Sequence, residues 1–337
     1  MKPEQASRTA GYMALFRAAE TVRPASQRLF ADSFAEHFLR PGLRRAVWLA
    51  RRPALANFLN RYADHRLPEA RTSAIARTRI IDDILGEDLE ASGLRQVVIL
   101  GAGFDCRAYR LPGLQRATVF EVDHPATLAT KLAVLRWLLP KIPDHVRHVE
   151  IDFNRQRLPD GLAQAGFQPA RPTIFLWEGV TNYLSAEAVE AVLRYVASCG
   201  PGSKIIFTYV HSGALDGSVY FEGAERLLRD VAKTDEPWTF GLAPADLTEF
   251  LSKTGLVLDR DLSANEYRSL YFGAAAQQMK GYEFYHVAAA HAGERTEPGT
   301  PGPIGSRNVY APSYFRRRGR MRDTSRLNAL PQTQRRG

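Results

Sequence analysis

The stretch VVILGAGFDCRAYRL, at residues 97–111, constrains the fold more than any other part of the sequence. Four apolar residues, three of them β-branched, lead directly into Gly101, Ala102 and Gly103. A short apolar run that ends at glycines is typical of a buried strand followed by a tight turn, where a ligand can approach the backbone closely. We therefore expect a strand here with a binding loop at its carboxyl end.

Further short apolar runs alternate with helical patterns along the chain. The expected strands are Val97–Leu100, Thr118–Val122, Val149–Asp152, Thr173–Trp177, Lys204–Val210, Leu256–Leu258 and Tyr282–Ala288. Ser185 can cap a helix after the fourth run, and a second helix is expected over roughly 244–253, ending at Gly255. This alternation predicts an α/β fold with a doubly wound, mostly parallel sheet of seven strands.

The composition divides the chain into three parts. Residues 1–90 show only helical patterns, which predict an N-terminal helical cap over one edge or the mouth of the sheet. Residues 91–291 carry the sheet, with an insertion near 211–241. Residues 292–337 form a basic tail rich in Gly, Pro and Arg, which we expect to be disordered because it offers little apolar surface to bury.

The basic charge argues against nucleic acid as the main partner because of where it lies. The formal net charge is +9, but residues 291–337 hold ten arginines and three acidic residues, so the first 290 residues carry only about +2. A weak contact of the tail with nucleic acid or an acidic surface stays open as an alternative.

The sequence shows no sign of a membrane protein or of a metal-binding protein. No stretch reaches the ~20 apolar residues of a membrane helix, and no secretory signal is recognisable, so no membrane contact is expected. Cys106 and Cys199 make no disulfide framework and lack the spacing of zinc ligands. We therefore expect a cytoplasmic protein without a metal site.

Acids and glycines follow the expected strands one after another. The second strand ends at Glu121-Val122-Asp123, the third at Asp152-Phe153 and the fourth at Glu178-Gly179. Open parallel sheets bind ligands at the carboxyl ends of their strands. An acid after the second strand suits ribose, because a carboxylate can accept two hydrogen bonds from the diol. This pattern predicts a nucleoside site.

Two nucleoside cofactors fit such a crevice. A dinucleotide site requires a third glycine at position 106, where this chain has a cysteine, and the Asp105 carboxylate is expected to repel a diphosphate. S-adenosyl-L-methionine has no phosphate, and an arginine can hold its carboxylate. A nicotinamide-dependent oxidoreductase stays the second hypothesis, and a non-catalytic or RNA-directed protein that uses the basic tail is the third.

Five blocks then carry a specific resemblance. They are ARTRIIDDIL (76–85), VILGAGFDCRAYRL (98–111), FEVDHPATLATK (120–131), IDFN (151–154) and FLWEGVTNYL (175–184). Over roughly residues 9–290 the chain resembles the leucine carboxyl methyltransferase family, within it the bacterial branch of S-adenosyl-L-methionine-dependent O-methyltransferases. The resemblance implies a class I methyltransferase fold, which is Rossmann-like. It also implies methylation of a carboxylate or hydroxyl on a small molecule.

The resemblance also assigns cofactor-binding positions. Arg77 falls where the family holds the cofactor carboxylate, Asp123 where it binds ribose, and Asp152 with Phe153 where it brackets adenine, the Phe replacing a usual Leu. The motif glycines fall on Gly101 and Gly103 and the strand-four acid on Glu178, while Arg17 loosely matches a second basic position. By position alone, the candidates for the acceptor pocket are Trp177, Tyr183, Tyr209 and His211.

Structural readings compete with several of these roles. Arg77 could lie on a solvated helix face, Asp123 could cap the following helix, Asp152 could be a turn residue and Glu178 could have a purely structural role. Lys131 is interpreted as an ordinary lysine on a helix surface. No residue stands out as a general base, which favours an acidic oxygen as the methyl acceptor, and the sequence specifies neither the acceptor nor the oligomeric state.

Overall fold

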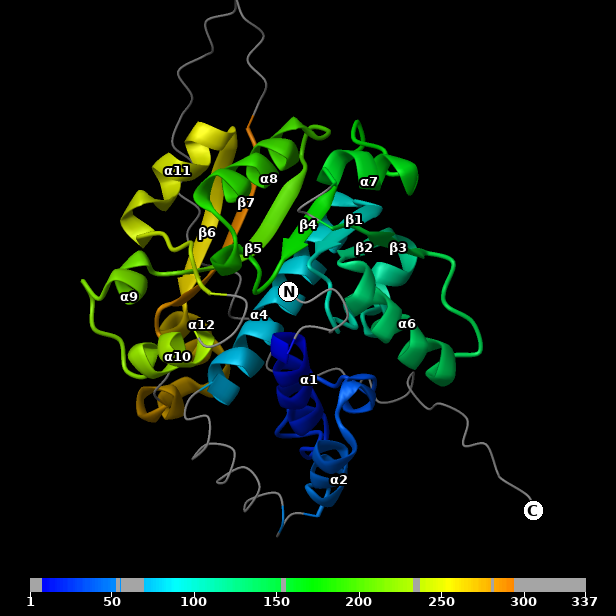
Figure 1. The fold of residues 1–337 in the computed structure, drawn as a ribbon, viewed down its shortest axis with the longest axis vertical. Helices are drawn as coiled ribbons and strands as arrows, with labels where there is room; N and C mark the ends of the chain where they lie inside the picture. The colour runs from blue at the N-terminus through cyan, green and yellow to red at the C-terminus, as the bar shows by residue number, and fades with distance from the viewer. Residues whose placement is uncertain are drawn as a thin grey trace, which may run out of the picture. The chain divides into compact units, whose positions relative to one another are not determined.

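A seven-stranded sheet forms the centre of the computed structural model, which describes residues 8–52, 55, 70–152, 156–232, 237–279 and 282–293 (Figure 1). Its strand order is β3-β2-β1-β4-β5-β7-β6. The strands are β1 (Gln96–Leu100), β2 (Thr118–Asp123), β3 (Val146–Glu150), β4 (Ile174–Trp177), β5 (Lys204–Val210), β6 (Leu256–Ser263) and β7 (Tyr285–Ala292). The first five strands are parallel and β7 is antiparallel to both neighbours, which confirms the predicted fold class.

The strand order reverses beside β1. This strand pairs with β2 on one side and with β4 on the other. The chain therefore builds β2 and β3 on one side of β1 and then crosses to the other side for β4 and β5. At such a switch point the connecting loops diverge and leave room for a ligand at the carboxyl ends of the strands. The loop after β1, residues 101–106, begins with Gly101-Ala102-Gly103, and this GAG loop lies at the switch point.

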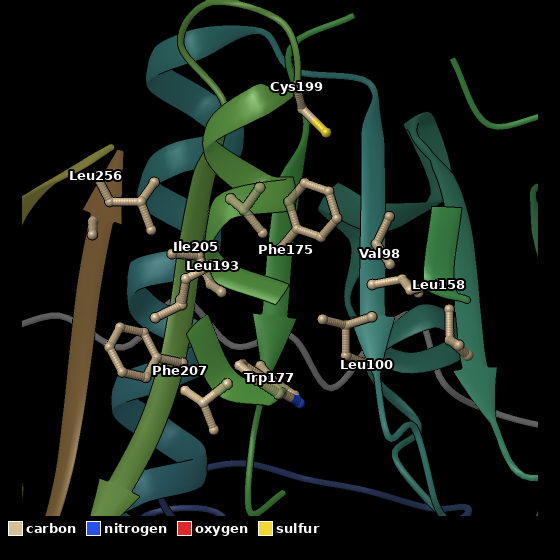
Figure 2. Packing of buried hydrophobic residues seen from close by; sticks show 14 of the residues in the cluster. Val98, Leu100, Leu158, Phe175, Trp177, Leu193, Cys199, Ile205, Phe207 and Leu256 are labelled. Carbon is tan, nitrogen blue, oxygen red and sulfur yellow. The ribbon is translucent and has the colours of Figure 1, made fainter. Parts of the chain in front are cut away.

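Helices cover both faces of the sheet. On one face α7 (Leu158–Gln164), α8 (Ala186–Ser198) and α11 (Leu247–Thr254) bury side chains in one cluster with Phe175 and Trp177. Figure 2 shows Leu158 of α7 and Leu193 of α8 in this layer. On the other face the covering helices are α4 (Ala70–Ser92), α5 (Arg107–Arg110) and α12 (Ala264–Phe272). Each large apolar side chain buried in these layers contributes about 1.5–3 kcal/mol to stability.

The first described helices pack against the GAG loop. They are α1 (Arg8–Thr21), the short 3-10 helix η1 (Ala35–Phe38) and α2 (Pro41–Leu49). Phe104, in the loop, belongs to their apolar cluster and stacks on Phe38 with ring centroids 4.6 Å apart. This part of the chain therefore contributes to the wall around the loop.

The remaining elements connect the layers. They are α6 (Pro125–Leu138), α9 (Ser212–Asp216), α10 (Ala224–Val231), and the 3-10 helices η2 (Pro112–Arg116), η3 (Thr181–Tyr183), η4 (Pro244–Asp246) and η5 (Gly273–Gln278). The Ser185 hydroxyl accepts the Ala188 N–H at 3.3 Å, which confirms the predicted cap of α8. In the described part of the chain no helix is both long and apolar enough to cross a bilayer.

Two strands are shifted along the chain from their predicted positions, and a third is longer. β7 spans Tyr285–Ala292 where Tyr282–Ala288 is expected, and β6 runs from Leu256 to Ser263 where it is expected to end at Leu258. The expected run Val149–Asp152 is in fact β3, which spans Val146–Glu150. It is an edge strand in which Val146 and Val149 are buried while Arg147 and Glu150 are exposed, so the run of apolar residues is interrupted. Asp152 consequently lies two residues beyond the end of the strand.

Candidate functional site

Both glycines of the loop after β1 have backbone angles that favour glycine. Gly101 has φ +62° and Gly103 has φ +45°. A Cβ atom on Gly101 would collide with Cγ2 of Val180, and one on Gly103 would lie 3.3 Å from Cβ of Ala10. The fold itself therefore explains both glycines. That they also admit the methionine part of a ligand stays a prediction.

Asp123, at the end of β2, faces this loop. Its Oδ2 accepts the N–H of Gly103 at 2.5 Å and its Oδ1 accepts the N–H of His124 at 2.6 Å. Burial raises the pKa of Asp123, and these two hydrogen bonds offset the effect only in part. A carboxylate offers about four acceptor sites, so two remain for a ribose diol. The cap of α6 is provided instead by His124, whose Nδ1 accepts the N–H of Ala126.

Arg77 and Glu178 form an ion pair although 101 residues separate them. Nε of Arg77, on α4, lies 2.9 Å from Oε1 of Glu178, just after β4. The Arg77 side chain is 7% exposed and its guanidinium lies 5.0 Å from the ring centroid of Tyr285. Arg77 is therefore not on a solvated helix face, and Glu178 does not carry an unpaired charge.

Arg107 contacts the second carboxylate oxygen of Glu178. Its Nη1 contacts Oε2 of Glu178 at 2.8 Å and Oδ2 of Asp105 at 2.5 Å, and its Nε contacts Oδ1 of Asp82 at 2.7 Å. Burial alone would raise the pKa of Glu178, but the charges of Arg107 and Arg77 outweigh it and hold that pKa below its ordinary value. The site is thus a network of paired ions.

The sequence interpretation treats Asp105 as an unpaired carboxylate, and the structure shows that it is paired. Its carboxylate also accepts the N–H of Arg107 at 2.7 Å, and Arg107 together with Arg17 overcomes the effect of burial and lowers the pKa of Asp105. The charge is balanced, so Asp105 does not by itself exclude a diphosphate. The sequence interpretation also missed Arg107, although two arginines closely following an acid in DCRAYR are a visible signal.

The other predicted positions lie around this network. The N–H of Ile151, next to Asp152, donates to the carbonyl of Asp123 at 3.0 Å, which brings Asp152 close to the end of β2. Phe153 lies outside the described residues. Nη2 of Arg17, on α1, donates to the carbonyl of Phe104 at 2.5 Å.

Two of the predicted acceptor-pocket residues belong to the core instead. Trp177 is 2% exposed within the packed face of the sheet. Tyr209 is fully buried and donates its hydroxyl to Asp261 at 2.8 Å. Tyr183 and His211 are partly exposed, so they stay candidates.

A cavity in the described part of the chain lies away from these residues. It has a volume of about 300 Å³ and is lined by Phe34, Tyr109, Gln115, Leu139, Pro143 and His145. None of the predicted cofactor residues lines it. The candidate site therefore depends on the placement of charges and backbone groups at the strand ends.

The residues present fit S-adenosyl-L-methionine. Asp123 keeps acceptor capacity for a ribose, and the Arg77–Glu178 pair presents one positive and one negative group, as an α-amino acid requires. The amide N–H of Gly179 donates to the Thr208 hydroxyl at 2.7 Å. Among the described residues, apart from Gly179 and its two chain neighbours, no heavy atom lies within 4 Å of where a Cβ on Gly179 would stand. Space next to the ion pair is thus available.

The strand order, with one antiparallel strand beside β5, defines a class I methyltransferase fold. A solved structure with this fold, a DUF574 family protein from Streptomyces avermitilis, superimposes with a TM-score of 0.52 at 14% identity, covering 86% of this chain and 98% of that one. The family model of leucine carboxyl methyltransferase matches residues 10–197, so the chain belongs to that family.

Curated relatives support this membership. A protein of Frankia alni named as an S-adenosyl-L-methionine-dependent methyltransferase is 36% identical over 217 residues, which cover 64% of this chain and 73% of the relative. A protein of Bacillus subtilis with the same name is 29% identical over 218 residues, covering 64% and 71%. These relatives favour the methyltransferase over the nicotinamide-dependent alternative.

Proposed function

We propose that this protein methylates an oxygen atom, in a carboxylate or a hydroxyl group, of a small molecule. As a member of the family it is an S-adenosyl-L-methionine-dependent methyltransferase. That cofactor supplies, when bound, a methyl carbon on a positively charged sulfur. The residues we propose to hold it are Arg77, Gly101, Gly103, Asp123, Asp152, Phe153 and Glu178.

The ion pairing of Glu178 is the observation that favours an acidic acceptor. Two arginines contact the Glu178 carboxylate and lower its pKa, which makes it a weak base. His211 is no better suited, because its Nδ1 accepts the N–H of Gly213 at 3.0 Å and its ring proton must then lie on Nε2. An acceptor that is already ionised at neutral pH, such as a carboxylate, needs no base from the protein.

The protein then acts mainly by orientation. Methyl transfer is an in-line displacement, so its rate depends on holding the acceptor oxygen, the methyl carbon and the sulfur in a row and on excluding water. The ion pair with Arg107 fixes the side chain of Glu178, and the two backbone hydrogen bonds fix Asp123. Such a rigid arrangement is what an orienting site requires.

A labelling experiment tests the oxygen acceptor. The full chain is incubated with S-adenosyl-L-methionine labelled in its methyl group and a small-molecule extract of the source cell, and the products are then treated with mild alkali. A methyl ester releases the label as volatile methanol, whereas ethers and N-methyl products retain it. Release in alkali is expected; label found on nitrogen or carbon would refute oxygen transfer.

The organisation of the chain follows from the same proposal. We assign residues 1–90 to a cap, 91–291 to the methyltransferase domain with the insertion near 211–241, and 292–337 to a tail that lies outside the described residues apart from 292 and 293. Cys106 and Cys199 are both buried and neither is in a disulfide, which suits the reducing cytoplasm. The proposed partner is the small-molecule acceptor alone, with no nucleic acid and no membrane.

A further inference from the structure

Arg107 forms ion pairs with three carboxylates from separate parts of the fold. Asp82 comes from α4, Asp105 from the GAG loop, and Glu178 from the end of β4, at distances of 2.5–2.8 Å. The Arg107 side chain is 3% exposed. A guanidinium has five N–H groups in a rigid plane, so it can keep these acids in fixed positions, which a lysine cannot.

The two arginines on Glu178 are unequal partners. Each contacts a different oxygen of the carboxylate, Arg77 at Oε1 and Arg107 at Oε2. Arg107 is anchored by two further acids, whereas Arg77 has Glu178 as its one acidic partner among the described residues, besides contacts with Met13 and the Tyr285 ring. Arg77 is therefore the partner that Glu178 can exchange.

An α-amino acid group carries both charges that such an exchange needs. Arg77 can turn from Glu178 to the carboxylate of a ligand, and Glu178 can accept hydrogen bonds from its ammonium. Glu178 then needs a counter-ion that does not leave with Arg77. Within the described network, Arg107 is the cation that also stays bound to the loop and to α4.

We propose that Arg107 is a positioning residue, which keeps the Glu178 carboxylate in place for the amino-acid end of the cofactor while Arg77 changes partner. This inference depends on the proposed function, because it requires the cofactor in this crevice. Without Arg107, Glu178 is free to turn both oxygens to Arg77. The ligand must then break a stronger ion pair to bind.

Two ligands separate this role from a general structural one. S-adenosylhomocysteine carries the amino-acid group, whereas 5′-methylthioadenosine has the same nucleoside without it. Calorimetric titration of the full chain measures both dissociation constants. For Arg107→Lys we expect binding of S-adenosylhomocysteine to weaken by about 10–100-fold, the range of a lost charged hydrogen bond, while binding of 5′-methylthioadenosine changes less than about threefold.

Arg110→Lys is the matched control. Arg110 is also buried and contacts both oxygens of Asp82, at 2.7 and 2.8 Å, but Glu178 is not among its partners. We expect this variant to bind both ligands like the wild type. If Arg107→Lys weakens both ligands equally, or weakens neither, the inference is wrong. A wild type that binds neither ligand refutes the proposed function itself.

A second variant covers the case that Arg107→Lys does not fold. Glu178→Asp keeps the charge but shortens the side chain by one methylene, so its carboxylate leaves the position that Arg107 fixes. We expect weaker binding of S-adenosylhomocysteine and unchanged binding of 5′-methylthioadenosine. Unchanged binding of both ligands would overturn the inference.

Discussion

Replacing Gly101 by alanine tests the geometry of the GAG loop quantitatively. Gly101 has φ +62°, where backbone strain destabilises a residue with a Cβ atom by about 1–2 kcal/mol. The new Cβ would also collide with Cγ2 of Val180, and overpacking of this kind costs about 1–3 kcal/mol. We therefore expect Gly101→Ala to lower the free energy of unfolding by about 2–5 kcal/mol in denaturant titrations.

Gly179→Ala separates the cost of backbone strain from the cost of the collision with Val180. Gly179 has a similar φ of +70°, but in the described part of the chain only Gly179 itself and its two chain neighbours can lie within 4 Å of the place that a Cβ atom would take. Its substitution should cost only the backbone strain, about 1–2 kcal/mol. Adding Val180→Ala to the Gly101→Ala variant should then recover part of the difference. Equal losses for the two glycine variants, together with no recovery, would refute the collision with Val180.

Three further predictions concern charged groups. Asp123→Ala should weaken binding of S-adenosylhomocysteine by about 1–3 kcal/mol in calorimetric titration, and an unchanged dissociation constant would contradict its assignment to the ribose. The folded-state pKa of Asp105 is lowered, so its stabilising contribution is present above about pH 4 and is lost as the pH falls below that value. The stability difference between wild type and Asp105→Asn should accordingly narrow in acid, and a constant difference would argue against the Arg107 pair. Lys131→Met should lower the free energy of unfolding by about 3–5 kcal/mol in urea titrations, because it leaves Glu121 buried without the lysine ammonium. Adding Glu121→Gln should restore much of that loss, and a loss that the second substitution does not reduce would contradict the pairing.

The strands could be predicted because apolar runs and glycines are local signals. β5 spans the predicted Lys204–Val210, and β1 begins one residue before the predicted run. β3 is harder to predict, because an edge strand needs only one buried face and Arg147 interrupts its apolar pattern. β7 lies inside the sheet, yet it too is shifted from its predicted run, because it spans Tyr285–Ala292. Local patterns therefore identify the presence of a strand better than its ends.

The buried charges could not be predicted in the same way. The sequence pattern predicts Lys131 on a helix surface, yet it is fully buried with its Nζ 2.9 Å from Glu121. Arg107 likewise depends on Glu178, 71 residues away in the sequence. Whether an ion can be buried depends on the partner that the fold brings to it, and a single sequence does not show which residues meet. The resemblance points to Arg77 and Glu178, but only the structure shows that they pair.

Contacts join α1 to the GAG loop, so binding of a ligand at the loop would also affect α1. Arg17 holds the carbonyl of Phe104 across 87 residues of sequence, and Ala10 lies beside Gly103. When α1 detaches, even briefly, the loop loses these supports. A ligand that needs the loop in this shape therefore shifts the opening equilibrium of α1 toward the closed state, and it protects residues 8–21 from proteases and from amide hydrogen exchange.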